Sequence, residues 1–264
     1  MSMPLLAPRL HAALSLLFAA AGGTVAGLSC GSAGATAPAA GHRGAGPGTY
    51  YIAPTGNDAT GNGSVANPWL TIRKALQSVP DGSTVLAKPG TYNGQQALDG
   101  VFTTGITVRS EMPYQARLRH SSVVVTCYYG KGITLEGFDI AHSGPGAGAL
   151  VMQVQDLIGA PGGTDRVSRI TIRNNVLHDS YNNDILKVNN GCSDVTVTGN
   201  VFYNQAGSDE HIDVNSVTDV VVQDNIFFND FAGSGRPVGN DTSSFIVIKD
   251  SNQNSDGQIG CDRI

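Results

Sequence analysis

Short stretches in which apolar and polar residues alternate recur along the second half of the chain. Alternation with a period of two is typical of β-strands, because successive side chains point to opposite faces. Three such stretches align without gaps, at 170–177 (ITIRNNVL), 195–202 (VTVTGNVF) and 220–227 (VVVQDNIF), and a fainter copy lies at 133–140. Each of the three contains an asparagine followed by an apolar pair, so that Asn175, Asn200 and Asn225 recur every 25 residues.

A regular repeat of this length indicates a solenoid, in which each repeat contacts only its neighbours. A helical solenoid is one alternative, but β-branched alternation and abundant Gly and Asn favour strands. The sequence therefore predicts an all-β chain of stacked coils. We expect the repeated asparagines to form a ladder at one turn of each coil, where they hydrogen-bond to backbone groups and have a structural role.

A second strand per coil is predicted upstream of each repeat, at 150–154, 184–189, 211–215 and 245–249. Aligned in register, these segments place Leu186, Val188, Ile212, Val214, Ile246 and Ile248 on the inner side. Alternation then sends five polar residues to the outer face of one sheet, namely Lys187, Asn189, Asp213, Asn215 and Lys249. This outer face is where we expect the chemistry of the protein.

The two ends of the predicted solenoid differ. Residues 70–79 (LTIRKALQSV) predict a short amphipathic helix whose apolar side is Leu70, Ile72, Leu76 and Val79. Such a helix can cap the first coil, which would otherwise expose apolar interior and strand edges. No similar cap follows the last strand-like segment, so we expect that the domain at 49–264 is C-terminally incomplete relative to similar proteins.

The N-terminal residues predict export. Arg9 precedes a largely apolar run at 12–26, the order typical of a secretory signal, which we place at 1–30. Cys30 follows Gly-Leu-Ser and resembles the cysteine of a bacterial lipobox, so the alternatives are simple cleavage and lipidation at Cys30. Residues 31–48 are almost entirely Gly, Ala and Pro and predict a flexible linker. The mature protein is then secreted or held at the cell surface, in the second case as an outer-membrane lipoprotein.

Composition excludes several classes of protein. The formal charge is −5 and Lys and Arg do not cluster, which argues against a nucleic-acid partner. No segment reaches the roughly 20 apolar residues of a membrane span, so no transmembrane helix is expected. Cys127, Cys192 and Cys261 lack the spacing of a zinc site and are interpreted as buried residues or one disulfide. The sequence leaves the oligomeric state open.

Three segments at the start of the predicted domain carry a family resemblance. They are 50–58 (YYIAPTGND), 67–76 (NPWLTIRKAL) and 88–92 (KPGTY), continued by ITVRSE at 106–111. Together they resemble the opening of right-handed parallel β-helix carbohydrate-active proteins of the pectate lyase-like superfamily. The resemblance implies a right-handed parallel β-helix, a fold that serves lyases, hydrolases and proteins without known activity alike.

Within this superfamily the chain resembles polysaccharide lyase family nine. Members of that family bind calcium through carboxylates on successive coils and use a lysine on a later coil as the base. The resemblance implies a calcium site formed by Asp184, Asp209, Glu210 and Asp213, with Lys249 as the base. The chain departs from the family at two positions, since Glu210 stands where aspartate is usual and Lys249 lies two positions from the column of Asp213.

These residue types suit β-elimination in a polysaccharide that contains uronic acid. Calcium takes six to eight oxygen ligands, and carboxylates on adjacent coils about 4.8 Å apart can converge on one ion. A neutral lysine can then take the C5 proton, with Lys249 as first candidate and Lys187 as second. His211, inside the acidic motif, is a further candidate for an acid or a sugar ligand.

Other interpretations remain open from the sequence. The acids could solvate a turn or pair with Lys187, and either lysine could form an ordinary surface salt bridge. Asp184 with Asp213 or Glu210 could supply the two carboxylates of a glycoside hydrolase. The chain could also be a non-catalytic β-helix that binds glycans or serves as an adhesin. An acidic polysaccharide is the expected substrate in the lyase interpretation.

Overall fold

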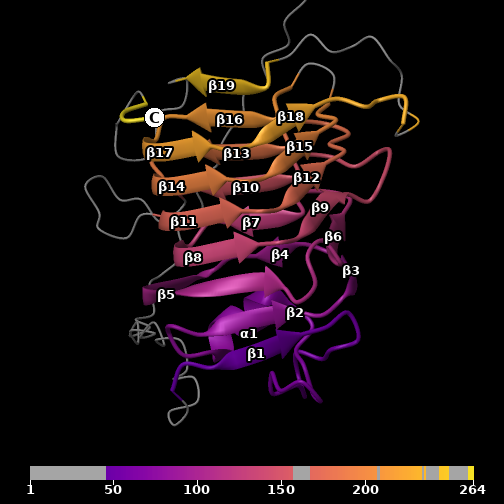
Figure 1. Ribbon diagram of the computed structural model, residues 1–264, viewed down its shortest axis with the longest axis vertical. Coiled ribbons are helices and arrows are strands. Elements are labelled where there is room, and N and C mark those ends of the chain that lie inside the picture. The colour runs from indigo at the N-terminus through magenta and orange to yellow at the C-terminus, as the bar shows by residue number, and fades with distance from the viewer. Residues whose placement is uncertain (1–45, 157–166, 207–208, 234, 236–243, 250–260) are drawn as a thin grey trace, which may run out of the picture. The chain divides into compact units, whose positions relative to one another are not determined.

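The structure is a computed structural model that describes residues 46–156, 167–206, 209–233, 235, 244–249 and 261–264 (Figure 1). The predicted signal peptide with Cys30 and most of the predicted linker lie outside the described residues. Within the described part of the chain, no helix is long and apolar enough to cross a membrane.

Three parallel sheets, which we call A, B and C, contain the described strands. Sheet A consists of β1 (Thr49–Ile52), β2 (Thr84–Ala87), β5 (Gly100–Ser110), β8 (Gly130–Glu136), β11 (Ser168–Arg173), β14 (Ser193–Thr198) and β17 (Thr218–Gln223). Sheet B consists of β3 (Gly90–Asn93), β6 (Ala116–His120), β9 (Asp139–His142), β12 (Val176–His178), β15 (Val201–Tyr203) and β18 (Ile226–Phe228). Sheet C consists of β4 (Gln96–Ala97), β7 (Val125–Cys127), β10 (Met152–Gln155), β13 (Leu186–Asn189), β16 (Ile212–Asn215) and β19 (Ile246–Lys249).

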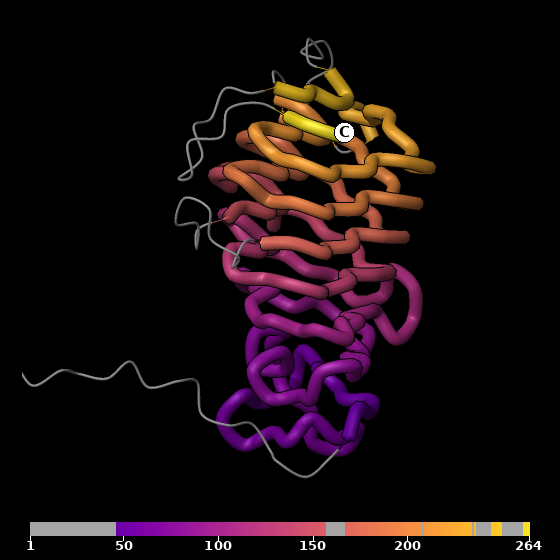
Figure 2. Tube along the Cα trace, turned by 90° about the vertical axis from the view of Figure 1, so that its left-hand side faces the viewer, coloured from indigo at the N-terminus to yellow at the C-terminus, as the bar shows by residue number. Residues whose placement is uncertain are grey.

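From β2 onward, successive strands visit sheets A, B and C in turn, so that each coil adds one strand to each sheet. Every pairing is parallel and joins a strand to the equivalent strand of the next coil. Figure 2 shows these coils one above another. The chain is a right-handed parallel β-helix, the hand that parallel crossover connections almost always take. The predicted fold class is confirmed.

The inner faces of the three sheets meet in one apolar core. In sheet C the register pairs Leu186 with Ile212 and Ile212 with Ile246, as the alignment of segments predicts. Leu186 and Ile212 are fully buried, whereas Ile246 is 37% exposed. The reason is that β19 is the edge strand of sheet C among the described residues, so one of its sides has no neighbouring strand there.

Helix α1 (Ile72–Ser78) packs into the first coils, where Figure 1 shows it beside β1 and β2. Thr71 is its N-cap, and the Thr71 side chain accepts a hydrogen bond from the backbone N–H of Lys74 at 3.1 Å. Ile72 and Leu76 are buried in the common core, which confirms the predicted capping helix. Leu70 is an exception, because it precedes the helix and is 38% exposed.

The repeated asparagines form the predicted ladder at the turn between sheets A and B. Asn175 donates from its backbone N–H to Oδ1 of Asn200 at 2.9 Å, and Asn200 donates in the same way to Oδ1 of Asn225 at 2.9 Å. The amide nitrogens of Asn175 and Asn200 also donate to backbone carbonyls of the preceding strands. The ladder therefore satisfies buried backbone groups at a bend in each coil.

Of the two interpretations of the cysteines of the domain, buried residues or one disulfide, the structure agrees with free, mostly buried thiols. Cys127 and Cys192 are buried free thiols in the core, and Cys261 is a partly exposed free thiol. Burial raises the pKa of the Cys127 and Cys192 thiols above the usual range. The disulfide alternative is therefore not realised among these three residues.

Candidate functional site

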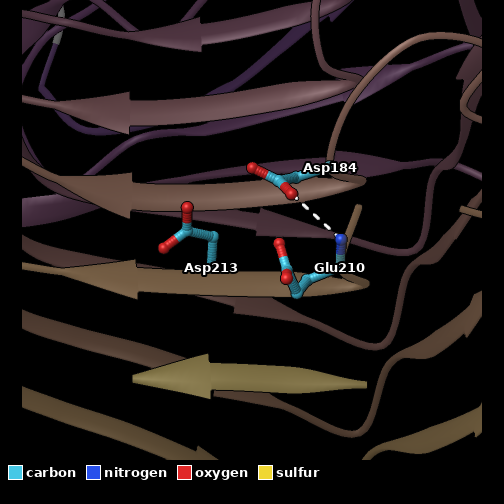
Figure 3. A group of neighbouring side chains, drawn as sticks. All are labelled: Asp184, Glu210 and Asp213. Atoms are coloured by element: carbon cyan, nitrogen blue, oxygen red, sulfur yellow. Dashed lines mark hydrogen bonds between the residues drawn. The ribbon is translucent and has the colours of Figure 1, made fainter. Parts of the chain in front are cut away.

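The candidate site lies on the outer face of sheet C, where strands β13 and β16 pair (Figure 3). The register pairs Lys187 with Asp213, so these two side chains are neighbours on adjacent coils. Asp184 precedes β13 by two residues and Glu210 precedes β16 by two residues, which gives them equivalent places on the two coils. The backbone N–H of Glu210 donates to Oδ1 of Asp184 at 3.0 Å and links the two positions.

Three carboxylates converge at this point. One carboxylate oxygen from each of Asp184, Glu210 and Asp213 lies within 4.8 Å of the others. The side chains of Asp184 and Asp213 are only 3% and 1% exposed, although they belong to the outer face of the sheet. Negative charges held so close together and away from water require compensation by positive charge.

Two lysines supply positive charge to this group. Nζ of Lys187 lies 2.6 Å from Oδ2 of Asp213 and 3.6 Å from Oδ2 of Asp184. Nζ of Lys249 lies 2.9 Å from the same Oδ2 of Asp213. Lys249 is paired in register with Asn215, so it reaches Asp213 diagonally across the strands. Although Lys249 lies two positions along its strand from the column of Asp213, its side chain still reaches the site.

The second oxygen of Asp213 differs from the first. Oδ2 accepts from both lysines, whereas Oδ1 is buried and has no hydrogen-bond partner among the described residues. A buried carboxylate oxygen without a partner is costly, and a functional site or an ion is a common reason for one. Three carboxylates with one such oxygen fit a hard cation such as Ca²⁺, which prefers oxygen ligands.

Electrostatics in the site favour protonation of one acid. Burial, a hydrogen bond with Asp184 and the charge of Asp184 raise the pKa of Glu210 to about 7. Burial and the charge of Asp184 also raise the pKa of Asp209, although Lys187 and Lys249 act in the opposite direction. Burial lowers the pKa of Lys249, but the hydrogen bond and charge of Asp213 raise it more, which gives a net increase.

The structure brings most, but not all, of the sequence-predicted residues together. Asp184, Glu210, Asp213, Lys187 and Lys249 are in contact or close to one another.

Two predicted residues lie outside the three-carboxylate group. Asp209 is close enough for its pKa to respond to Asp184, yet it is not one of the three converging acids. The ring of His211 is fully buried, packs edge-on against Phe227 and Phe245, and lies 3.2 Å from the carbonyl oxygen of Phe228. These surroundings suit a structural histidine better than one that meets a sugar.

Sequence reasoning missed a polar chain on the coil before the acids. Oη of Tyr128 donates to Oε1 of Gln153 at 2.7 Å, and Nε2 of Gln153 donates to Oε1 of Gln155 at 2.8 Å. Gln153 pairs in register with Lys187, so this chain continues the outer face of sheet C beyond the acids. The alternation of Met152–Gln155 was the available signal, since it sends both glutamines outward.

Comparison with known proteins gives two solved structures. One is pectate lyase Pel9A, with 22% sequence identity and a TM-score of 0.48 over 70% of this chain and 46% of that chain. The other is a rhamnogalacturonan lyase, with 18% identity and a TM-score of 0.42 over 67% of this chain and 56% of that chain. The chain thus spans about half the length of the structures that it matches. No protein-family model and no curated protein sequence matches it.

At this level of identity the similarity concerns the fold. The function has to be argued from the residues of the site.

Proposed function

We propose that the protein is a calcium-dependent lyase that cleaves a polysaccharide containing uronic acid by β-elimination. The observation that carries this proposal is the group of Asp184, Glu210 and Asp213, in which Oδ1 of Asp213 is buried without a partner among the described residues while Oδ2 of the same residue contacts two lysines. An ordinary structural salt bridge rarely leaves such an oxygen, because hydrogen bonds satisfy nearly all buried polar atoms.

Ca²⁺ fits the three acids by ligand type. The group brings one oxygen from each of three carboxylates on two coils within 4.8 Å of one another, and calcium, which accepts six to eight oxygens in flexible geometry, could take its other ligands from water or substrate. Asp184, Glu210 and Asp213 would hold the ion, whose positive charge would compete with the lysines for Asp213 and would neutralise the carboxylate of a bound uronate. Asp213 lies within β16 and Asp184 lies two residues before β13, and both side chains are buried, so the sheet holds them in place before a substrate arrives.

The elimination itself needs a base beside the acids. In β-elimination the base takes the C5 proton, the electrons of the C5–H bond form a C4–C5 double bond, and the C4–O bond breaks. The leaving oxygen departs with the bonding electrons and gains a proton from water, and the protonated base returns its proton to the hydroxide that is left. The products are a 4,5-unsaturated uronate and a new chain end, with no net water consumed.

Lys249 is the proposed base and Lys187 the alternative. Although burial lowers the pKa of Lys249, Asp213 raises it more, so the neutral amine would become accessible once a bound cation offsets the charge of Asp213. The Lys249 side chain is 37% exposed, whereas that of Lys187 is 20% exposed. Lys187 lies within reach of both Asp184 and Asp213, a position suited to holding the acids. Lys249 contacts Asp213 from the neighbouring coil with more of its side chain in solvent, where a substrate can reach it.

The test follows the ultraviolet absorbance of unsaturated product. Purified protein is incubated with polygalacturonate, alginate or chondroitin, with calcium or with chelator. We expect a calcium-dependent rise on one of these polymers, lost in Lys249→Ala and reduced in Lys187→Ala. A rise that survives Lys249→Ala would assign the base to Lys187. A flat trace on all three substrates would contradict the lyase proposal.

A glycoside hydrolase is the second candidate, because Glu210 has the pKa of about 7 that a general acid needs near neutral pH. Asp184 or Asp213 would be its carboxylate partner. Hydrolysis releases reducing ends without ultraviolet absorbance, so the same incubation separates the two reactions. Reducing ends without unsaturated product, lost in Glu210→Gln, would favour the hydrolase. If neither product forms, a glycan-binding or adhesin role is the remaining interpretation.

The proposed substrate places the protein outside the cytoplasm. We propose that residues 1–30 direct export and that the mature chain acts in secreted form or at the cell surface, with Cys30 as the site of a lipid anchor in the second case. Mass spectrometry of the mature N-terminus tests this proposal. A mature chain that begins with a lipidated Cys30 gives the anchored form, and one that still begins at Met1 contradicts export through this segment.

A further inference from the structure

A second feature lies at the C-terminal ends of the sheet B strands, where the turns that lead to sheet C begin. His178, Tyr203 and Phe228 are the last residues of β12, β15 and β18 and are paired in register. Their rings are stacked, with centroids 4.6 Å and 5.1 Å apart and planes inclined by 10° and 11°. Exposure increases along the column, from 8% at His178 to 42% at Phe228. The column therefore ends in an aromatic face that is open to solvent.

A hollow of about 420 Å³ adjoins this face, lined by Asp179, Tyr203, Asn204, Phe228, Asp230 and Gly233. Its volume lies within the range of about 300–1,000 Å³ that small-molecule sites occupy. None of these residues belongs to the site on sheet C. An exposed ring beside a hollow with polar groups is typical of sites that bind a partly apolar, partly hydroxylated ligand.

Hydrogen bonds hold the polar wall of this hollow in place. Nδ2 of Asn204 donates to Oδ1 of Asp179 at 2.9 Å and to the carbonyl oxygen of Asp230 at 3.2 Å. In return, the backbone N–H of Asp230 donates to Oδ1 of Asn204 at 2.7 Å. Gly233 donates its N–H to Oδ1 of Asp230 at 2.9 Å. The two carboxylates are thus oriented by the turn itself and can accept further hydrogen bonds from a ligand.

The charge of the hollow selects the ligand. Asp179 and Asp230 are acidic, and the described lining residues include no lysine or arginine. The carboxylate of Asp179 pairs with the ring of His178 at 2.8 Å, so a uronate or another anion would be repelled chiefly by Asp230. A neutral sugar avoids this repulsion, because its hydroxyl groups donate to carboxylates while its C–H face packs on an aromatic ring.

We propose that this hollow is a subsite for one neutral pyranose residue of a glycan, packed on Phe228 and Tyr203 and hydrogen-bonded to Asp179 and Asp230. The subsite does not rest on the lyase proposal, since it shares no residue with the carboxylate group on sheet C. Burial and the charges of Asp179 and Asp139 raise the pKa of Tyr203 to about 12, so its hydroxyl remains protonated and can also hydrogen-bond to the sugar.

The experiment titrates purified protein with neutral tetrasaccharides of galactose, glucose, mannose and xylose, with tetragalacturonate as the anionic probe, and follows binding by calorimetry. We expect at least one neutral probe to bind with an affinity that falls about tenfold or more in Phe228→Ala and in Asp230→Asn. Phe228→Tyr should restore binding, because it keeps the ring. Tyr114→Ala is the matched control, since Tyr114 is 43% exposed and Phe228 42%, and it should bind as wild type does.

Three outcomes would overturn the subsite. The first is that no neutral probe shows saturable binding at concentrations up to about 10 mM, since a weaker Kd corresponds to little binding free energy. The second is neutral binding that Phe228→Ala and Asp230→Asn leave unchanged, and the third is tetragalacturonate binding that Phe228→Ala abolishes. Circular dichroism of each variant shows whether it is folded, and Phe228→Tyr separates loss of the ring from loss of the fold.

Discussion

The asparagine ladder and the carboxylate group are both columns of side chains at equivalent places in successive coils. They differ in whether each buried polar atom has a hydrogen-bond partner. In the ladder, Asn175 and Asn200 give each buried amide a partner above or below. In the carboxylate group, Asp184 pairs with Glu210 and Lys187 with Asp213, so the residue type changes from coil to coil. One buried oxygen of Asp213 has no partner among the described residues.

The difference separates structural from functional positions in a solenoid. A side chain that repeats in every coil satisfies its neighbours and stabilises the stack. A column that breaks the repeat and keeps an unsatisfied group loses stability there, which is a common feature of functional sites. The comparison predicts that substitutions in the ladder reduce stability, whereas substitutions among the carboxylates reduce activity.

The largest expected effect is the loss of activity in Asp213→Asn. Asn has the same shape but carries no charge, so it binds calcium more weakly. We expect calcium-dependent formation of unsaturated product to fall about 100- to 1,000-fold, measured by ultraviolet absorbance. Asp224→Asn is the matched control, because Asp224 is an exposed acid on a turn of sheet A, and its activity should equal that of wild type. Equal activity in Asp213→Asn and Asp224→Asn would remove Asp213 from the mechanism.

A substitution in the asparagine ladder should reduce stability. Asn200→Ala leaves the buried backbone N–H of Asn175 and the carbonyl of Ile172 without their partners. We expect the free energy of unfolding to fall by about 2 to 4 kcal/mol, measured by urea denaturation. Asn182 is the control, since its exposed side chain accepts one hydrogen bond from Ala149, and Asn182→Ala should cost less than about 1 kcal/mol. Similar losses in both variants would contradict a special role for the ladder.

Calcium should stabilise the protein only when the carboxylate group is intact, because a ligand that binds only the folded state stabilises it. At about 100 times its Kd, calcium should raise the free energy of unfolding by about 2.7 kcal/mol. Asn200→Ala should show the same increase, and Asp213→Asn should show little of it. Urea denaturation with calcium and with chelator measures each value. An equal increase in Asp213→Asn would place the calcium site elsewhere.

Most of the fold could be predicted from the sequence, because equivalent residues in successive coils form the same strand, turn and core contact. The 25-residue spacing of Asn175, Asn200 and Asn225 sets the length of a coil, and the alternation around Leu186 and Ile212 sets the register of sheet C. Exposure at Ile246 could not be predicted in this way, because it depends on what lies beyond β19 rather than on the pattern of the strand.

The site could be predicted less completely. Charged residues that alternate along paired strands must share a face, so Lys187, Asp213 and Lys249 were accessible to sequence reasoning. The side chain of His211 was not, because this residue precedes its strand and local conformation turns the ring against Phe227 and Phe245. The hollow beside Phe228 depends on turns that sequence patterns describe poorly, and neither its volume nor its aromatic face was foreseen.

The column of His178, Tyr203 and Phe228 shares features with both groups, since its rings stack in the manner of a ladder while its first member can be protonated. Burial lowers the pKa of His178, but hydrogen bonds with Asp139 and Asp179 and their charges raise it more, to above the usual value of 6.5. The folded state therefore favours the protonated ring. This contribution to stability is fully present below pH 6.5 and is lost as the pH rises through the folded pKa.

Because His178→Gln keeps hydrogen-bonding groups but does not titrate, it should lack this loss. We expect the smallest effect here, a decline in the free energy of unfolding of wild type between pH 6 and pH 9 that is shallower in His178→Gln. The decline amounts to about 1.4 kcal/mol for every tenfold by which folding strengthens proton binding to the ring. Urea denaturation across this range measures both proteins under the same conditions. Parallel pH profiles would mean that Asp139 and Asp179 do not hold the proton on His178, and the column would then behave as a purely structural ladder.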